Sequence, residues 1–204
     1  MYVWLGINVD GQLGGIKEKA KETDKALAFT NSCFTLPLHI SLKMSFAIDD
    51  AKFPEIAADI ENYYSSVEPF EIDVRGIENE QVIVWIRMCE CERLNEIHDD
   101  LNELLLNKYG IGLHEYDTDY KFHTTLFMGS DTDKINDAFE RVKDTPIPKK
   151  LTADRFVIGT SQSGALGTYS IYKEITKGTV AVRCRNRDLA LVGVQRYARE
   201  SKRG

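Results

Sequence analysis

Two histidines stand in the same local pattern at distant points of the sequence. In each case an apolar residue precedes the histidine, a hydroxyl residue lies two positions after it, and a leucine follows. The two segments are Leu38-His39-Ile40-Ser41-Leu42 and Phe122-His123-Thr124-Thr125-Leu126. Because side chains two residues apart on a β-strand point to the same face, each segment would present an imidazole and a hydroxyl together.

This set of groups suits reactions at a phosphodiester. One imidazole, His39 or His123, can remove a proton from the attacking water or hydroxyl while the other protonates the departing oxygen. The hydroxyls of Ser41 and Thr125 can hold the non-bridging phosphate oxygens, on which charge accumulates in the transition state. The sequence therefore predicts phosphodiester chemistry that needs no metal.

The same alternation along the strand places one lysine on the polar face of each motif. Lys43 continues the face of His39 and Ser41, and Lys121 precedes His123 on the same face. We predict that both lysines contribute to phosphate binding. The four cysteines, Cys33, Cys89, Cys91 and Cys184, have no C-x-x-C spacing typical of a zinc site, so we expect no metal and no other cofactor.

The elements that would position these residues mix hairpins with crossovers. Alternating apolar residues predict strands near 2–9, 35–47, 70–78, 81–88, 122–128, 151–160 and 168–175. Helical spacing predicts helices near 13–31, 56–67, 94–105 and 135–142, and Gly110 supplies a residue suited to ending the third of them. This order is typical of an α+β fold with mostly antiparallel sheets.

With its two H-x-[ST] motifs, His39-Ile40-Ser41 and His123-Thr124-Thr125, the sequence resembles the 2H phosphoesterase superfamily, which includes 2′-5′ RNA ligase-like proteins and RNA 2′,3′-cyclic phosphodiesterases. The resemblance covers about residues 1–176. It implies duplicated β-α-β-α-β units, forming two lobes whose sheets face a central cleft with the helices outside. It also implies hydrolysis of a 2′,3′-cyclic phosphate to a 2′-phosphate, with His123 as general base and His39 as general acid, or the reverse.

Composition and charge limit the partners. The 204-residue chain is 43% hydrophobic and has a net charge of −6. Residues 177–204 nevertheless carry eight basic and two acidic side chains. We therefore treat them as a basic C-terminal extension of the two-lobed domain 1–176. No apolar run is long enough to cross a membrane, and no basic secretory start is present, which favours a cytoplasmic protein. The sequence does not fix the oligomeric state, and we favour a monomer.

The expected partner is an RNA end or a small nucleotide. Trp4, Tyr169 and Tyr172 are candidates for stacking on a base, because aromatic faces bind nucleobases without sequence preference. Two alternatives stay open: a noncatalytic module that binds nucleotides or RNA ends in the same cleft, and 2′-5′ RNA ligase activity in the reverse direction.

Overall fold

The computed structural model of the chain describes residues 1–178 and 182–183. The strands are β1 (Tyr2–Asn8), β2 (His39–Ala47), β3 (Phe70–Glu80), β4 (Ile83–Met88), β5 (His123–Met128), β6 (Lys150–Ala153), β7 (Arg155–Ser161), β8 (Ser170–Thr176) and β9 (Val182–Arg183). The helices are α1 (Gly14–Leu27), α2 (Phe53–Ser66), α3 (Glu92–Tyr109) and α4 (Thr132–Val142). The predicted α+β class is confirmed.

The strands form two sheets. Their orders are β2-β1-β7-β8 and β5-β4-β3-β6, with β9 beside β3. All pairings are antiparallel except that of β3 with β9. The two strands that carry the histidine motifs, β2 and β5, are therefore the edge strands of different sheets, and they contact each other where the sheets meet.

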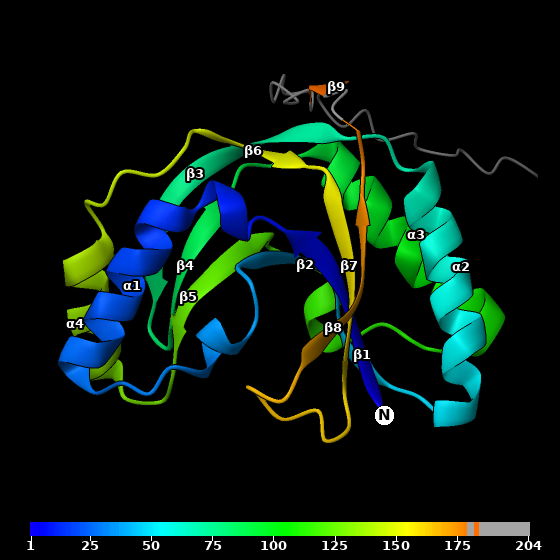
Figure 1. The fold of residues 1–204 in the computed structure, drawn as a ribbon, viewed down its shortest axis with the longest axis horizontal. Coiled ribbons are helices and arrows are strands. Elements are labelled where there is room, and N and C mark those ends of the chain that lie inside the picture. Colours follow the sequence, from blue (N-terminus) through cyan, green and yellow to red (C-terminus); the bar gives the residue numbers. More distant parts are fainter. Residues whose placement is uncertain (179–181, 184–204) are drawn as a thin grey trace, which may run out of the picture.

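Helices α1 and α3 are exchanged between the sheets. Figure 1 shows α1 and α4 together on one side of the molecule, and α2 and α3 on the other. Although α1 follows β1, it packs with α4 over the sheet that contains β5, whereas α3, which follows β4, packs against β2. Because α1 and α3 each bury an apolar face on the sheet of the other lobe, while α2 and α4 pack on the sheet that they follow, the two lobes share one hydrophobic core.

The predicted elements agree with the structure except late in the chain. Helix α3 ends before Gly110, whose φ of 69° lies in the left-handed region that glycine adopts at low cost. The single strand expected over 151–160 is instead two strands, β6 and β7, which are separated by Asp154 and belong to different sheets. The polar pair Asp154-Arg155 shifts the phase of the apolar alternation here, but so short an interruption does not by itself reveal that the chain crosses between the sheets.

No helix within the described part of the chain is long and apolar enough to span a membrane. Strand β8 ends at Thr176, next to the proposed domain boundary. Most of the predicted basic extension, residues 179–181 and 184–204, lies outside the described residues, so its role stays a prediction.

A hydrogen bond joins the two edge strands at their motifs. The hydroxyl of Thr124, the central residue of the second motif, donates to the backbone carbonyl of His39 at 3.1 Å. The Thr124 side chain is fully buried. This bond satisfies a carbonyl that an edge strand would otherwise leave without a strand partner, and it fixes the first motif relative to the second.

We expect Thr124→Val to lower the free energy of unfolding by about 1–3 kcal/mol, because the isosteric side chain leaves the buried carbonyl of His39 without its donor. Urea unfolding measures the change. The control is Thr160→Val on β7, a partly buried strand threonine away from the contact between the edge strands. Equal stability of the Thr124 variant and the wild type would show that the bond does not hold the lobes together.

Candidate active site

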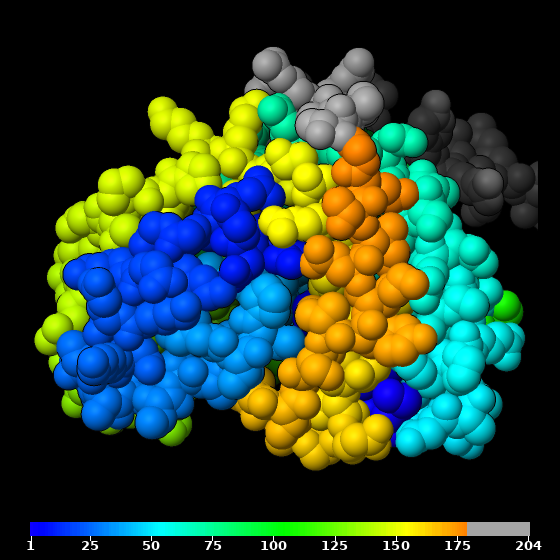
Figure 2. Space-filling model, in the orientation of Figure 1, coloured from blue at the N-terminus to red at the C-terminus, as the bar shows by residue number. Residues whose placement is uncertain are grey.

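A cavity of about 180 Å³ lies where the two edge strands meet. Its lining includes His39 and Ser41 from β2, Thr125 from β5, and Tyr169 just before β8. In Figure 2 the light-blue segment before β2 and the gold loop before β8 border a hollow on the visible face. The structure thus brings together polar side chains from both motifs, and His123 lies on β5 two residues before Thr125.

Both histidine rings are held in the same way by the backbone. Nδ1 of His39 lies 2.8 Å from the carbonyl oxygen of Pro37, and Nδ1 of His123 lies 2.6 Å from that of Lys121. A carbonyl oxygen only accepts hydrogen bonds, so Nδ1 carries the hydrogen in both rings. Each neutral imidazole therefore has its lone pair on Nε2, which is the nitrogen left for acid–base chemistry.

A tryptophan packs against each histidine. The ring centroids of Trp4 and His39 are 4.4 Å apart, as are those of Trp85 and His123. Trp85 lies on β4 opposite Thr125 and reaches His123 diagonally. Sequence reasoning missed Trp85, because recognising it requires the pairing of β4 with β5.

Trp4 reaches His39 by a different route that depends on two glycines. Its indole passes over Gly6, which pairs with Ser41, and over Gly159 on β7. A Cβ atom added to Gly159 would lie 2.1 Å from Nε1 of Trp4, and one added to Gly6 would lie 2.5 Å from Cζ3 of the same ring. Only glycine at these positions leaves room for the indole to lie flat against the sheet.

The surroundings favour the neutral form of both rings. Burial lowers the pKa of His39 below its ordinary value, against the smaller opposing effect of the Pro37 carbonyl. The pKa of His123 is lowered to about 4, mainly by burial and in part by the positive charges of Arg87 and His39. The Lys121 carbonyl and Glu80 act in the opposite direction and raise this pKa. The effect of His39 on His123 also shows that the two rings interact electrostatically.

The two predicted phosphate-binding lysines are already engaged. The Lys43 ammonium is 1% exposed, forms an ion pair with Asp117, and donates to the Gly112 carbonyl at 3.3 Å. The pairing of β1 with β2 is irregular at this point. Leu5 pairs with Lys43 and its neighbour Gly6 pairs with Ser41, so β2 has one extra residue between Ser41 and Lys43. Despite this irregularity Lys43 lines the smaller cavity together with Ser41, as predicted from strand alternation.

Lys121 stays near the surface. It lies just before β5, its side chain is 45% exposed, and its Nζ is 3.7 Å from Oε1 of Glu80. Its backbone carbonyl, rather than its amine, contacts the ring of His123. The phosphate-binding roles of both lysines therefore stay predictions, and neither has an ammonium free of a carboxylate.

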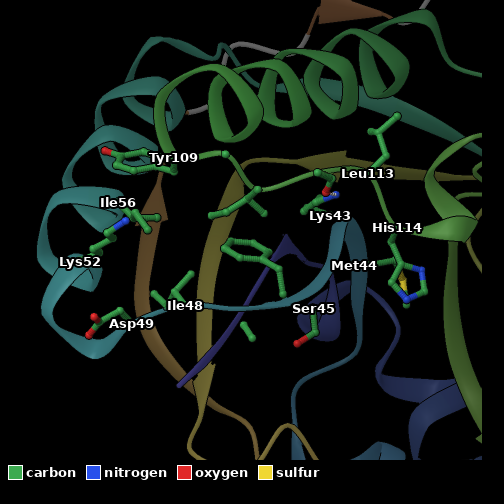
Figure 3. Close-up of a pocket in the computed structure, with 15 residues that line it drawn as sticks. Lys43, Met44, Ser45, Ile48, Asp49, Lys52, Ile56, Tyr109, Leu113 and His114 are labelled. Atoms are coloured by element: carbon green, nitrogen blue, oxygen red, sulfur yellow. Dashed lines mark hydrogen bonds between the residues drawn. The ribbon is translucent and has the colours of Figure 1, made fainter.

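Asp117 holds the loop between α3 and β5 against β2. One of its carboxylate oxygens accepts from the backbone N–H of His114 at 2.7 Å, and the other lies 3.5 Å from Nε2 of His98. Burial alone would raise the pKa of Asp117, but its bonds to Lys43 and His114 lower it overall. The loop and the second half of β2 enclose a larger cavity of about 490 Å³, which Figure 3 shows with Lys43 and His114 on its lining.

The three aromatic residues proposed to stack on a base have different surroundings. Tyr169 lines the smaller cavity, and its hydroxyl forms a hydrogen bond with Ser45. Trp4 also borders that cavity but is only 6% exposed and packs against His39. Tyr172 is not brought to the site: it packs edge-on against Phe53 of α2, at 4.7 Å between ring centroids. Tyr169 is therefore the best placed of the three for stacking.

Comparison with known proteins agrees with this fold and these motifs. Residues 18–165 match the model of the 2′-5′ RNA ligase superfamily. The chain therefore belongs to this superfamily, which confirms the resemblance to 2H phosphoesterases. A Staphylococcus epidermidis protein named "Putative phosphoesterase" is 26% identical over 108 residues, which are 52% of this chain and 60% of that protein.

Solved structures share the fold at low sequence identity. The protein TT0787 of Thermus thermophilus aligns with a TM-score of 0.54 and 15% identity, over 86% of this chain and 97% of that one. E. coli LigT, in its complex with NADP+, aligns with a TM-score of 0.52 and 13% identity, over 87% of this chain and 97% of that one. The arrangement of two sheets and four helices is thus that of the LigT-like fold.

We expect Gly159→Ala to lower the free energy of unfolding by about 1–3 kcal/mol, because the added methyl group forces the Trp4 indole away from the sheet. The matched control is Gly15→Ala in α1, where an added Cβ meets no atom within 4 Å. Urea unfolding of the two variants provides the measurement. A Gly159 variant as stable as the control would contradict the close packing of Trp4 over this glycine.

Proposed function

We propose that this protein is a metal-independent phosphodiesterase that hydrolyses 2′,3′-cyclic phosphates at RNA ends or on nucleotides to 2′-phosphates. The observation that carries the proposal is the matched tethering of two imidazoles at the contact between two sheets. His39 and His123 each donate Nδ1–H to a backbone carbonyl two residues earlier, which leaves two basic Nε2 atoms. Membership in the superfamily supports phosphoester chemistry in general.

The reaction needs one neutral and one protonated imidazole, and we assign these roles to His123 and His39 respectively. His123, whose pKa lies near 4, is neutral at physiological pH and can accept a proton on Nε2 from the attacking water. As the water oxygen bonds to phosphorus, the bond from phosphorus to the 3′ oxygen breaks. Protonated His39 then donates its Nε2 proton to that leaving oxygen, so the two rings end in exchanged protonation states.

The hydroxyl groups would hold the phosphate during this exchange. Ser41 and Thr125 both line the cavity and are partly buried. Each lies two residues after its histidine on the same strand, so it can donate to a non-bridging oxygen while the imidazole reaches the reacting oxygen. Tyr169, at the rim of the same cavity, is placed to contact the nucleoside.

A noncatalytic receptor for nucleotides or RNA ends is the second candidate. The observation that favours it is the lowered pKa of both imidazoles, which reduces the fraction that is protonated and could act as the acid. The structure of E. coli LigT in complex with NADP+ supports nucleotide binding by this fold. A 2′-5′ ligation in the reverse direction uses the same acid–base pair, and product analysis distinguishes it.

We expect the wild-type protein to hydrolyse nucleoside 2′,3′-cyclic monophosphates in the presence of EDTA. His39→Ala and His123→Ala should each lower the rate about 100- to 10,000-fold, because each removes one acid–base group. Chromatography identifies the product. The control is His114→Asn, which keeps a side-chain acceptor for the backbone N–H of Tyr116. Tight binding without turnover would support the receptor instead.

The pH dependence of kcat/KM provides a separate check. The base must be neutral, so the rate rises as pH increases through the pKa of His123, about 4. The acid must be protonated, so the rate falls as pH increases through the pKa of His39, which lies below 6.5. We expect kcat/KM to decrease with increasing pH above about 6.5, because the pKa of the acid lies below the ordinary histidine value. A rate that still increases above pH 7 would contradict these roles.

A further inference from the structure

The proposed reaction places a growing negative charge on the non-bridging phosphate oxygens, and the one proton carried by the imidazoles is directed to the leaving oxygen rather than to these oxygens. The lysines near the motifs do not supply a balancing positive charge, since Lys43 is paired with Asp117 and Lys121 lies near Glu80. A cation with an unused donor is therefore needed at this cavity.

Arg87 lies beside His123. The two residues are direct partners in the antiparallel pairing of β4 with β5, so their side chains leave the sheet on the same face. Trp85, two residues earlier on β4, shares that face, and the guanidinium carbon of Arg87 lies 5.7 Å from the centroid of its ring. The indole thus lies next to both the imidazole and the guanidinium.

The Arg87 guanidinium is buried without a full set of acceptors. The residue is only 9% exposed, and Nη1 is buried with no hydrogen-bond partner. Among the described residues it forms no ion pair, unlike Lys43 and Lys121. Burying an unsatisfied charged donor destabilises a protein, and such a group is expected where a ligand supplies the missing acceptor.

The first lobe has no counterpart to this cation. Asn8 is the residue that pairs with His39, as Arg87 pairs with His123. The Asn8 side chain is neutral, and its Nδ2 donates to Oε2 of Glu174 at 2.5 Å. Of the two residues that pair with the motif histidines, only Arg87 carries a positive charge.

We propose that Arg87 is the phosphate-binding cation of this site, and that its guanidinium donates to a non-bridging oxygen of a phosphate held between the two histidines. This inference rests on the proposed function and specifies its substrate class further: the ligand is a ribose phosphate anion. A planar guanidinium offers two parallel donors to a phosphate, which a lysine ammonium cannot match. The dianionic 2′-phosphate product should bind through Arg87 more tightly than an uncharged nucleoside.

The test compares Arg87→Met, Arg87→Lys and the wild type. Methionine keeps an unbranched stem to pack on Trp85 but removes the charge, and lysine restores the charge without the two parallel donors. The control is Arg75→Met on β3, since Arg75 is 65% exposed and pairs with Glu78 three residues away. Thermal unfolding checks that each variant is folded.

Calorimetric binding of adenosine 2′-monophosphate is the first measurement, and it does not require turnover. We expect Arg87→Met to weaken binding about 10- to 100-fold, as for the loss of a hydrogen bond to a charged group, with partial recovery in Arg87→Lys. Adenosine itself should bind all the proteins equally weakly. Unchanged affinity in Arg87→Met, or no binding of the nucleotide to wild-type protein, would overturn the proposal.

Titration of the His123 imidazole by NMR is the second measurement. The groups that act on this ring are Arg87, His39 and Glu80, together with the Lys121 carbonyl. Removing the charge in Arg87→Met should raise the pKa of His123, whereas Arg75→Met should leave it unchanged. A packing role for Arg87 alone would not move this pKa in the folded variant, so an unmoved value would count against the proposal.

The two proposals fail in distinguishable ways. If the wild type hydrolyses cyclic phosphates and Arg87→Met is equally active and binds equally well, the role of Arg87 is overturned and the phosphodiesterase stands. If the wild type binds the 2′-phosphate through Arg87 but turns nothing over, the phosphodiesterase is overturned and the anion site stands. If Arg87→Met does not fold, the Arg87→Lys variant provides the test. Wild-type affinity and activity in Arg87→Lys would show that the guanidinium is not required and would overturn the proposal.

Discussion

The contact between β2 and β5 is the constraint on which the site depends. Each strand is the edge of its own sheet, so each has one side without a neighbouring strand. The Thr124 hydroxyl bonds to the His39 carbonyl across this contact, which places the two motifs side by side without continuous pairing between the sheets. The exchange of α1 and α3 between the lobes supports the contact, because each helix follows a strand of one sheet and packs against the edge strand of the other.

That contact gives the imidazoles their chemical properties. A backbone carbonyl fixes the tautomer of each ring, and a tryptophan covers one face of each. Low exposure disfavours the charged form, so both pKa values fall below the ordinary histidine value. The glycines beneath Trp4, Gly6 and Gly159, contribute to this environment although they carry no chemistry, because any side chain there would displace the indole.

Sequence reasoning predicted what depends on short-range alternation. The pattern placed His39 with Ser41 and His123 with Thr125 on the same strands, and the family resemblance indicated the two sheets and the central cleft. It placed Lys43 beside Ser41, and both line the smaller cavity, but the ion pair of Lys43 with Asp117 involves a distant loop and could not be predicted. Arg87 went unnoticed for a similar reason, since its place beside His123 follows only from the register of β4 with β5.

The duplicated motif does not produce two equivalent halves. Trp85 covers its histidine from the neighbouring strand directly, whereas Trp4 must cross a glycine to reach the other. The strand partner of His39 is a neutral amide that is already bonded to a carboxylate, whereas the partner of His123 is a buried cation. A positive charge disfavours a second one nearby, so Arg87 disfavours protonation of His123, whereas the strand partner of His39 carries no charge. The repeated fold thus supplies two similar bases, and the residues on the adjacent strands give them different electrostatic surroundings.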